Sequence, residues 1–393
     1  MSNNILYLGF SPKKDFMDEI YKLDSRPAIQ TVNYGHKLLQ VLGHVGNVVN
    51  LSTPPIQDYP HGRKILLIHK GWFKNRFIPF INIVGFKQLF RLFFSSFYIM
   101  LERVKNGGGW IVLHGVHTPF FIAAFFGKIV GYKIMLVATD PPGVVLHTDG
   151  FIRRFLKLID RKIINIFFIM VDCLIVPTED FVNNYRFNTG ISYIVIPGIV
   201  SEDDILCIGG SGSVKGEDIK VCYSGSVYED NGLDSLVMSA VLFDRNVSLH
   251  IVGSGEYIDE LKKTAENAHN IYFHGFHSGE SYNKLMKSMD IMLNVRDPDK
   301  GFTSYSFPSK LLEYLLRDKV VITSRLRNIP SELENCFEYF DDLSPAGIAK
   351  KINDVVVSNS VPGPINNRKV VLDNFSIDSL AKKICLMIGS RNV

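Results

Sequence analysis

The sequence contains few cysteines, no long hydrophobic run and no marked excess of one charge. Its five cysteines among 393 residues are scattered and include no C-x-x-C pair. This pattern predicts reduced thiols in the cytoplasm, and neither a disulfide framework nor a zinc site. The most apolar stretches, 86–101 and 163–171, are interrupted by charge or too short for the roughly 18–20 apolar residues of a membrane-spanning helix. The N-terminal residues lack the features of a signal peptide and predict a first β-strand.

The nearly balanced charge of the chain does not indicate a nucleic-acid-binding protein. The formal net charge is only +4, charged residues make up 21% of the chain, and no nucleic-acid-binding motif is present. A hydrophobic content of 46% provides enough apolar side chains for ordered cores. Asp297-Pro298-Asp299 has the D-x-D pattern of some metal-dependent enzymes, but the proline favours a solvated loop. No other spacing indicates metal ligands, so no bound metal is expected.

Strand-like and helix-like segments alternate along the chain, which predicts parallel α/β layers. A length of 393 residues favours two domains. The predicted linker is 198–216, because it contains the glycine- and serine-rich run 209–213. The predicted domains are residues 1–199 and 200–375, each a doubly wound Rossmann-like sheet, followed by a helix over 376–393 that crosses back to the first domain. Ligands are expected in the crevice between the two domains, at the carboxyl ends of the strands.

The expected elements follow from the spacing of apolar residues and from glycine and proline breakers. In the first half, strands are expected over 5–10, 64–69, 110–114, 133–138, 173–177 and 193–196, and helices over 28–42, 88–104 and 118–130. In the second half, strands are expected over 220–224, 248–252, 271–273, 291–295 and 320–323, and helices over 232–242, 256–267, 281–288 and 308–316.

One segment indicates its chemistry from the residues alone. Residues 304–315, SYSFPSKLLEYL, lead from a small polar loop into a helix whose apolar residues are interrupted by Glu313. Pro308 suits the first turn of a helix. Backbone N–H groups at the helix start and the charge of Lys310 suit a phosphate group. Glu313 can accept hydrogen bonds from a sugar diol. These features predict one half of a nucleotide-sugar site.

The same segment resembles a known family. Phe307-Pro308-Ser309-Lys310 followed by Glu313-Tyr314 is similar to the FPSK…EY signature of GT-B glycosyltransferases of the retaining, GT4-like type. Many of these enzymes build bacterial O-antigen, capsule or exopolysaccharide. Further segments resemble the family pattern in the same order: LHIVGSG at 249–255, IYFHG at 271–275, DIMLNVR at 290–296, KVVIT at 319–323 and NIP at 328–330. The first half of the chain matches only loosely.

The resemblance implies a site for a nucleotide diphosphate-sugar, with a UDP-sugar as the expected donor and no cofactor or metal. Glu313 would bind the ribose hydroxyls, and Ser309 belongs to the same motif. The family carries a second glutamate eight positions before this one, where the present chain has Tyr305. The phenol of Tyr305, or the backbone around Ser306, would meet the donor sugar instead.

A second departure concerns the diphosphate. The family often has an arginine and a lysine after the first strand of the second domain, where this chain has Ser226 and Asn231. Negative charge develops on the leaving diphosphate and has to be neutralised. Arg296 and Lys310 are therefore the expected substitutes. The alternative for Arg296 is a surface ion pair with a neighbouring aspartate.

Four further residues are candidates for the donor site because they follow predicted strands. Gly225 and Gly255 would allow the close approach of a ligand, or simply form turns. His274 and Phe276 would flank the nucleobase, or else His274 has a purely structural role.

In the first domain the candidate catalytic residues are Asp140 and His114. Asp140 lies in the loop after the predicted strand 133–138 and would contact the acceptor or the sugar hydroxyls. Its alternative role is to open a turn before two prolines. His114 ends the predicted strand 110–114 and would point into the crevice.

Residues 153–162 mix basic and apolar side chains at nearly helical spacing. Such a helix lies on a membrane surface, or packs on its own sheet with a solvated basic face.

We expect a glycosyltransferase in surface-polysaccharide biosynthesis that uses a saccharide acceptor linked to a lipid. It is expected to work in the cytoplasm, peripherally at the inner face of the membrane. The alternatives are an inverting GT-B enzyme with Asp140 or His114 as general base, and a catalytically silent GT-B scaffold subunit.

Overall fold

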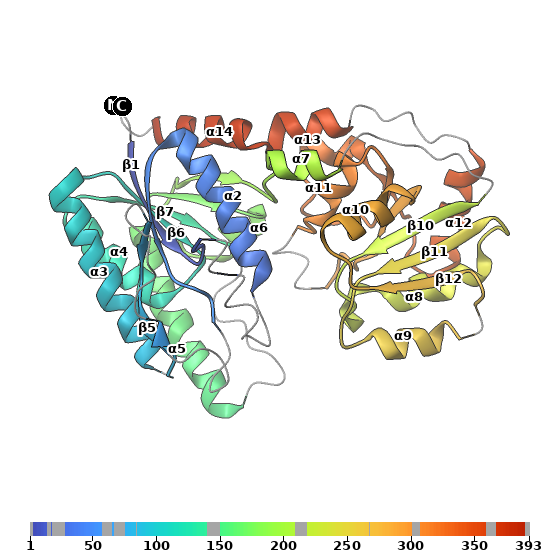
Figure 1. Ribbon diagram of the computed structural model, residues 1–393, viewed down its shortest axis with the longest axis horizontal. Helices are drawn as coiled ribbons and strands as arrows, with labels where there is room; N and C mark the ends of the chain where they lie inside the picture. The colour runs from blue at the N-terminus through green and yellow to red at the C-terminus, as the bar shows by residue number, and fades with distance from the viewer. Residues whose placement is uncertain are drawn as a thin grey trace. The chain divides into compact units, whose positions relative to one another are not determined.

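The computed structural model describes residues 3–13, 17, 28–56, 65–66, 75–83, 85–139, 150–208, 218–266, 268–300, 307–358 and 367–389. The chain divides into two compact units (Figure 1). The first unit combines Met1–Ile199 with Ile377–Val393, and the second unit is Val200–Ser376. Each unit is built on a main parallel β-sheet with helices on both faces. The prediction of two Rossmann-like α/β domains is confirmed.

The main sheet of the first unit has seven parallel strands in the order β4-β2-β1-β6-β7-β8-β9. They are β1 (Asn3–Gly9), β2 (Gly46–Ser52), β4 (Asn75–Phe77), β6 (Trp110–His114), β7 (Lys133–Val137), β8 (Cys173–Val176) and β9 (Ser192–Val195). Successive side chains of a strand point to opposite faces. On β1, Leu6 and Leu8 join one hydrophobic core, and Ile5 and Tyr7 join the other. The sheet is therefore buried on both faces, as parallel sheets generally are.

Helices provide the other side of each core. On the Leu6 face lie α3 (Phe86–Asn106), α4 (Thr118–Ile129), α5 (Phe151–Phe167), η1 (Phe168–Met170) and α6 (Glu179–Asn184). On the Tyr7 face lie α2 (Ile29–Val45) and the last helix of the chain, α14 (Ile377–Gly389), which pack against each other. A separate antiparallel pair is formed by β3 (Ile65–Leu66) and β5 (Phe80–Ile81).

The second unit has six parallel strands in the order β12-β11-β10-β13-β14-β15. They are β10 (Ile219–Ser224), β11 (Val247–Val252), β12 (Ile271–Gly275), β13 (Ile291–Asn294), β14 (Val320–Thr323) and β15 (Glu338–Tyr339). The alternation of faces is again visible on β10, where Val221 and Tyr223 join one core and Cys222 joins the other. All strands run in one direction, so their carboxyl ends meet along one edge.

The helices of the second unit also divide between the two faces. The Val221 core includes residues of α8 (Leu233–Ser239), η3 (Ala240–Leu242), α9 (Ile258–Thr264) and α12 (Pro345–Val357). The Cys222 core includes residues of α7 (Glu202–Ile208), α10 (Gly279–Lys287), α11 (Lys310–Leu316), η5 (Ser331–Cys336) and α13 (Asn367–Phe375). The short turn η2 (Glu229–Asn231) precedes α8.

Two glycines allow the loops after β10 and β11 to touch. A Cβ on Gly253 would lie 1.8 Å from the carbonyl oxygen of Gly225, and the backbone of Gly253 has a φ of +143°. A Cβ on Gly255 would lie 2.0 Å from the carbonyl oxygen of Val227. Side chains at either position would therefore collide with backbone. These glycines are required by contact between loops of the protein itself, whatever else approaches them.

The structure corrects one feature of the predicted linker over 198–216. Residues Glu202–Ile208 form the helix α7, and Ile208 is buried in the core of the second unit. Ser201 and Asp204 cap its start reciprocally, since the Ser201 backbone N donates to Asp204 Oδ2 at 2.7 Å and the Asp204 backbone N donates to Ser201 Oγ at 3.4 Å. The run of acidic residues is thus the first turn of a helix, where the positive end of the helix dipole stabilises it. The glycine-rich run 209–213 lies outside the described residues.

Candidate functional site

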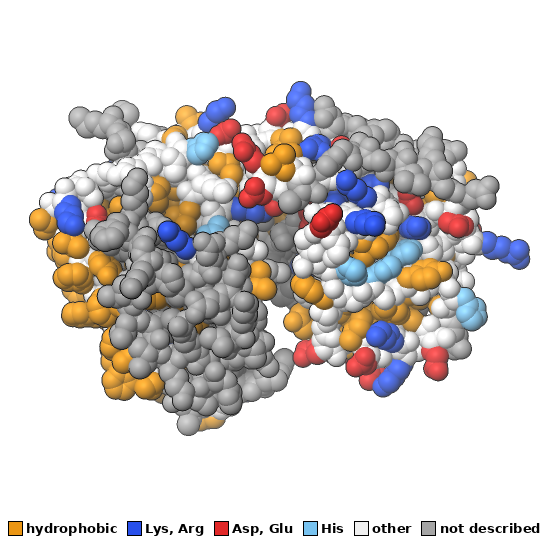
Figure 2. All heavy atoms as spheres, viewed as in Figure 1, with side chains coloured by type: hydrophobic (Ala, Val, Ile, Leu, Met, Phe, Trp, Pro, Cys, Tyr) orange, Lys and Arg blue, Asp and Glu red, His pale blue; other side chains and the backbone are white. Residues whose placement is uncertain are grey.

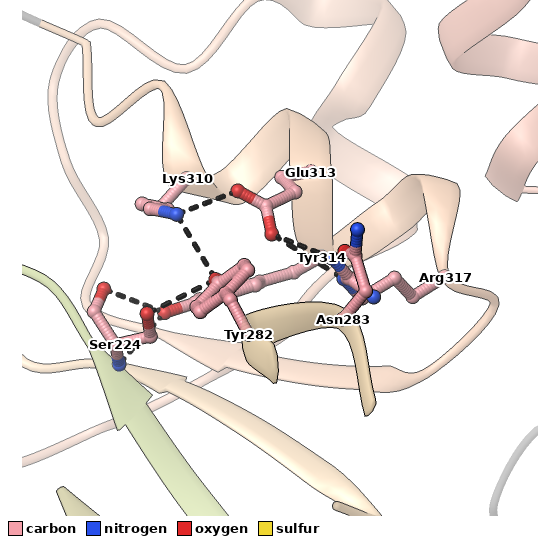
Figure 3. Close-up of polar contacts among 7 residues, drawn as sticks. All are labelled: Ser224, Tyr282, Asn283, Lys310, Glu313, Tyr314 and Arg317. Atoms are coloured by element: carbon pink, nitrogen blue, oxygen red, sulfur yellow. Dashed lines mark hydrogen bonds and ion pairs between the residues drawn. The ribbon is translucent and has the colours of Figure 1, made fainter. Parts of the chain in front are cut away.

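The principal site residues gather around α11 at the carboxyl end of β10 (Figure 3). Helix α11 is anchored by its buried residues Leu311, Leu312, Leu315 and Leu316. Tyr314 is buried too, and its Oη lies 2.9 Å from both the backbone N and the backbone O of Ser224, the last residue of β10. This contact fixes the helix against the strand end. Glu313 interrupts the apolar series and is left on the side that carries the charged groups.

Glu313 lies between two cations. Lys310 Nζ is 2.7 Å from Glu313 Oε2, and Arg317 Nη2 is 3.0 Å from Glu313 Oε1. Burial opposes the ionisation of Glu313, but the charges of Lys310 and Arg317 outweigh it and hold the pKa of this carboxyl below its ordinary value. The carboxylate is therefore ionised at neutral pH. Its side chain remains 24% exposed, so it has a surface that a ligand can reach.

Lys310 is placed by Tyr282 of α10 as well as by Glu313. Its Nζ donates to Tyr282 Oη at 2.9 Å and lies 4.3 Å from the centre of the Tyr282 ring. Tyr282 Oη is 3.0 Å from Ser224 Oγ. Burial raises the pKa of Tyr282 to about 12, so the phenol is protonated at neutral pH. Burial of Lys310 lowers its pKa, but the negative charge of Glu313 outweighs this effect and holds the pKa above its ordinary value. The ammonium therefore stays charged.

Arg317, Tyr282 and Asn283 belong to this site but were missed by sequence reasoning. The Arg317 side chain is 4% exposed, and its Nη2 also donates to Asn283 Oδ1 of α10 at 2.7 Å. The spacing contained a signal, because Lys310, Glu313 and Arg317 are three and four residues apart and share one face of the helix. Tyr282 and Asn283 gave no comparable signal, since they come from a different helix.

Other predicted donor-site residues lie along the same strand edge. Gly225 directly follows β10, and Gly255 follows β11. Arg296 follows β13 by two residues, and burial lowers the pKa of its guanidinium although nearby Tyr223 and Tyr314 oppose the shift. Ser309 is exposed at the start of α11. The structure thus brings these residues to the edge where doubly wound sheets bind ligands.

His274 takes part in a stack of aromatic rings on β11 and β12. His250 stacks on Tyr272 and on His274, with ring centres 5.0 and 5.1 Å apart. His250 Nδ1 is 2.8 Å from His274 Nε2, and His250 Nε2 is 3.1 Å from Ser248 Oγ. One nitrogen of His274 is therefore already occupied, which favours the structural role. Phe276, just beyond the strand, is 71% exposed.

We expect the stacked histidines to make the second unit less stable in mild acid. Burial, reinforced by His274 and Lys220, lowers the pKa of His250 to about 4. Below pH 6.5 the ring of His250 binds a proton in the unfolded state but not in the folded state. The free energy of unfolding therefore keeps its full value above pH 6.5 and decreases as the pH falls toward 4. Between pH 7 and pH 5 the free energy of unfolding should decrease by about 2 kcal/mol, since one pKa unit corresponds to about 1.4 kcal/mol.

Urea unfolding at pH 7 and at pH 5 measures this effect, followed by circular dichroism in the wild type and in His250→Gln. The variant should lose the part of the pH dependence that His250 causes. An identical difference between the two pH values in both proteins would show that His250 is not responsible.

In the first unit, His114 lies inside the protein. It ends β6 on the face that α2 covers and is only 1% exposed. Its Nδ1 is 2.6 Å from Tyr7 Oη, which is 2.8 Å from Ser11 Oγ. Its Nε2 is buried without a hydrogen-bond partner among the described residues. Burial lowers the pKa of His114 to about 4, so the ring is neutral at pH 7.

His114 thus lies beneath α2 within the first unit, and its catalytic role stays a prediction. Side chains alternate along β6, so His114 follows Trp110 and Val112 into the core beneath α2. A Cβ on Gly35 of α2 would come within 3.0 Å of the His114 ring, and Tyr34 of the same helix has its ring centre 5.5 Å from it. The other catalytic candidate, Asp140, lies outside the described residues, as do Tyr305 and Ser306.

Within the described part of the chain, no group of three or more histidine, cysteine, aspartate or glutamate side chains is arranged to hold a metal ion. Asp297 and Asp299 form other contacts. Asp297 Oδ1 accepts from the backbone N of Asp299 at 2.9 Å, and Asp299 pairs with Arg327 at 2.7 Å. The D-x-D pattern is thus a turn with an exposed ion pair.

Comparison with known proteins identifies a domain within the second unit. Residues 218–358 match the model of a family described as glycosyl transferases group 1. No curated protein matches the sequence at a significant level.

Several solved structures share the fold over nearly the whole chain. HepE of Anabaena in complex with UDP is 13% identical, with a TM-score of 0.62 over 98% of this chain and 100% of that one. Sucrose-phosphate synthase of Thermosynechococcus elongatus is 14% identical, with a TM-score of 0.64 over 99% and 98%. The lipopolysaccharide outer core galactosyltransferase WaaB is 12% identical, with a TM-score of 0.60 over 99% of both chains. At such identities the likeness concerns the fold. The chain therefore contains a group 1 glycosyltransferase domain over residues 218–358, and it shares its two-domain fold with these solved structures.

Proposed function

We propose that the protein transfers a sugar from a nucleoside diphosphate-sugar to a saccharide acceptor, with a UDP-sugar as donor. The observation that carries the proposal is the ionised, partly exposed Glu313 held between Lys310 and Arg317 beside the carboxyl end of β10. An ionised carboxylate is acceptor-only and suits the two hydroxyls of a ribose. The choice of UDP is supported by the similar HepE, which binds UDP and UDP-glucose in its solved complexes.

In this proposal Lys310 and Arg296 neutralise the diphosphate as the glycosidic bond breaks. The ammonium of Lys310 has three N–H donors. Two are directed to Glu313 and Tyr282, and the third can serve a phosphate oxygen, because the side chain is 39% exposed. Ser309 would assist from the start of α11. Gly225 and Gly255 would line the same edge, and Phe276 would cover the base, with His274 beneath it.

The stereochemical course is proposed to be retention, on the resemblance of the FPSK…EY segment to retaining GT4-like enzymes. Tyr305 and Ser306 would then contact the transferred sugar, and Asp140 the acceptor or the sugar. The inverting alternative needs a general base. His114 has the required neutral ring, but it is buried and bonded to Tyr7, so Asp140 is the better candidate for that role.

The acceptor is proposed to be a lipid-linked saccharide in surface-polysaccharide biosynthesis, such as O-antigen or capsule assembly. The similar WaaB, a lipopolysaccharide outer core galactosyltransferase, supports this class of acceptor. A lipid-linked acceptor is presented at a membrane surface. The proposal therefore places the protein in the cytoplasm, peripherally on the inner face of the cytoplasmic membrane.

The proposal is tested with the purified protein and a panel of nucleotide sugars. A thermal-shift screen should single out one donor, and that donor should release nucleoside diphosphate when a lipid-linked saccharide is added. The anomeric configuration of the product, measured by NMR, then distinguishes retention from inversion. Donor binding without nucleotide release on any acceptor would favour the scaffold alternative, and no binding of any nucleotide sugar would contradict the proposal.

A further inference from the structure

Helix α3 in the first unit presents large apolar side chains to its exposed side as well as to the core. Its buried positions are Arg91, Ser95, Ile99 and Glu102, of which three are polar. Leu92, Phe94 and Tyr98 pack against the core. Six further large apolar residues of the helix face outward and are exposed: Phe86, Leu89, Phe93, Phe97, Met100 and Val104. A surface helix normally presents polar and charged side chains to the solvent. Contiguous apolar side chains on the surface mark an interaction site.

The outward apolar surface continues across the two neighbouring helices. Helix α4 packs against both α3 and α5 on the same face of the sheet. It exposes Phe125, Phe126 and Ile129. Phe125 lies 6.1 Å from Phe167 of α5, measured between ring centres. Figure 2 shows hydrophobic side chains gathered along the edge of the first unit that α3 occupies in Figure 1.

Helix α5 adds both apolar and basic groups to this surface. Its exposed apolar residues, with those of the following turn, are Phe151, Phe155, Leu156, Leu158, Ile159, Ile166 and Ile169. The helix sequence contains five basic residues and one acidic residue, Asp160. Asp160 accepts a hydrogen bond from Thr118 of α4. Arg161 and Lys162 are exposed, so a strongly basic helix borders the apolar surface.

We propose that this three-helix face, formed by α3, α4 and α5, docks on the surface of an anionic lipid bilayer. Exposed phenylalanines and aliphatic side chains can enter the boundary between headgroups and acyl chains, while basic side chains attract anionic headgroups. No helix among the described residues is long and apolar enough to cross a membrane. The proposal rests on these surfaces alone and not on the proposed reaction.

Charge distinguishes the bilayer from a second copy of the chain as occupant. A two-fold symmetric dimer through this face would bring the same patch of each copy together. The basic α5 helices would then approach each other with only one acidic residue in each, and like charges at close range repel. An anionic bilayer supplies the missing negative charge.

The test is flotation of the full chain with phosphatidylcholine vesicles, with and without phosphatidylglycerol, at low and high salt. The variants are Phe93→Ser with Phe97→Ser on α3, and Arg161→Ser with Lys162→Ser on α5. The matched control is Lys382→Ser with Leu386→Ser on α14, which changes one exposed basic and one exposed apolar residue on the opposite face of the sheet. Thermal unfolding midpoints establish that each variant is folded.

The wild type should bind the anionic vesicles, and less well at high salt. The α3 variant should lose at least about tenfold in partitioning, because two phenylalanines no longer enter the lipid. The α5 variant should lose at least about tenfold at low salt, since each basic residue near an anionic surface strengthens binding about fivefold. The control should stay within about twofold of the wild type.

Three outcomes would overturn the proposal. The first is the absence of vesicle binding at low salt. The second is binding that neither the α3 nor the α5 variant reduces. The third is a protein that does not bind vesicles but forms a concentration-dependent dimer in sedimentation velocity, with the α3 variant remaining monomeric. The face would then be an interface between two copies.

Discussion

Replacing Arg317 by Met should lower the free energy of unfolding of the second unit by about 3–5 kcal/mol, because removal of one partner leaves the other as a poorly compensated buried charge. The Arg317 side chain is 4% exposed, and its guanidinium contacts both Glu313 and Asn283. Its loss leaves Glu313 with Lys310 as its remaining cation and frees Asn283 Oδ1. For a unit of this size the thermal midpoint should fall by about 10 °C.

Two companion variants isolate the cause. Lys351→Met breaks the ion pair of Lys351 with Glu338, which has the same 2.7 Å separation as Lys310 and Glu313 but is more exposed than Arg317. It should lower the free energy of unfolding by less than about 1 kcal/mol. Glu313→Leu combined with Arg317→Met removes both charges and should recover much of the stability lost in the single variant. A free energy of unfolding for Arg317→Met within about 0.5 kcal/mol of the wild-type value would refute the buried-pair explanation.

The fold could be predicted from the sequence where strands are buried on both faces. The strands expected over 110–114 and 320–323 coincide with β6 and β14, because runs such as WIVLH and VVIT are bounded by clear breaks. The strand β2 was missed because it follows α2 without a breaker, at Val45 and Gly46. Helix α7 was missed because its acidic first turn is typical of a linker as well as of a helix start.

The candidate site was only partly predictable for a different reason. Lys310 and Glu313 lie in one recognisable segment, so their proximity follows from helical spacing. Tyr282 and Asn283 reach them from α10, and Ser224 from the end of β10. Such contacts depend on how the helices pack on the sheet. No local pattern in the sequence encodes that packing.

His114 illustrates the limit of reasoning from position along a strand. A polar residue at the carboxyl end of a parallel strand is a reasonable candidate for a ligand site. Its direction, however, is fixed by the alternation of side chains, and on β6 this alternation turns His114 into the core with Trp110 and Val112. Tyr7 of β1 then satisfies one ring nitrogen. The same parity could have been applied to the sequence, but the helix that covers each face could not be known.

Glu313→Gln should leave the second unit folded and weaken binding of the donor nucleotide roughly 10- to 150-fold. This is the range expected when hydrogen bonds from a diol to a charged acceptor, worth about 1.5–3 kcal/mol, are lost. The amide keeps one oxygen that can accept from Arg317, so the helix retains part of its contacts. Isothermal titration calorimetry with UDP, or with the nucleotide that the thermal-shift screen selects, measures the change.

A ligand lacking one hydroxyl tests the assignment of Glu313 to the ribose. If Glu313 accepts hydrogen bonds from the diol, the wild type should bind the 2′-deoxy nucleotide more weakly than the parent nucleotide. In Glu313→Gln the difference in affinity between the two nucleotides should be much smaller, because groups in contact are energetically coupled. Glu338→Gln serves as the control, since Glu338 is also paired with a lysine at 2.7 Å but belongs to β15. Its affinities should match those of the wild type. An equal penalty for the deoxy nucleotide in the wild type and in Glu313→Gln would place the ribose elsewhere, even if the overall affinity falls. Wild-type affinity in a folded Glu313→Gln protein would remove Glu313 from the donor site altogether, and the ion-paired cluster on α11 would then have only a structural role.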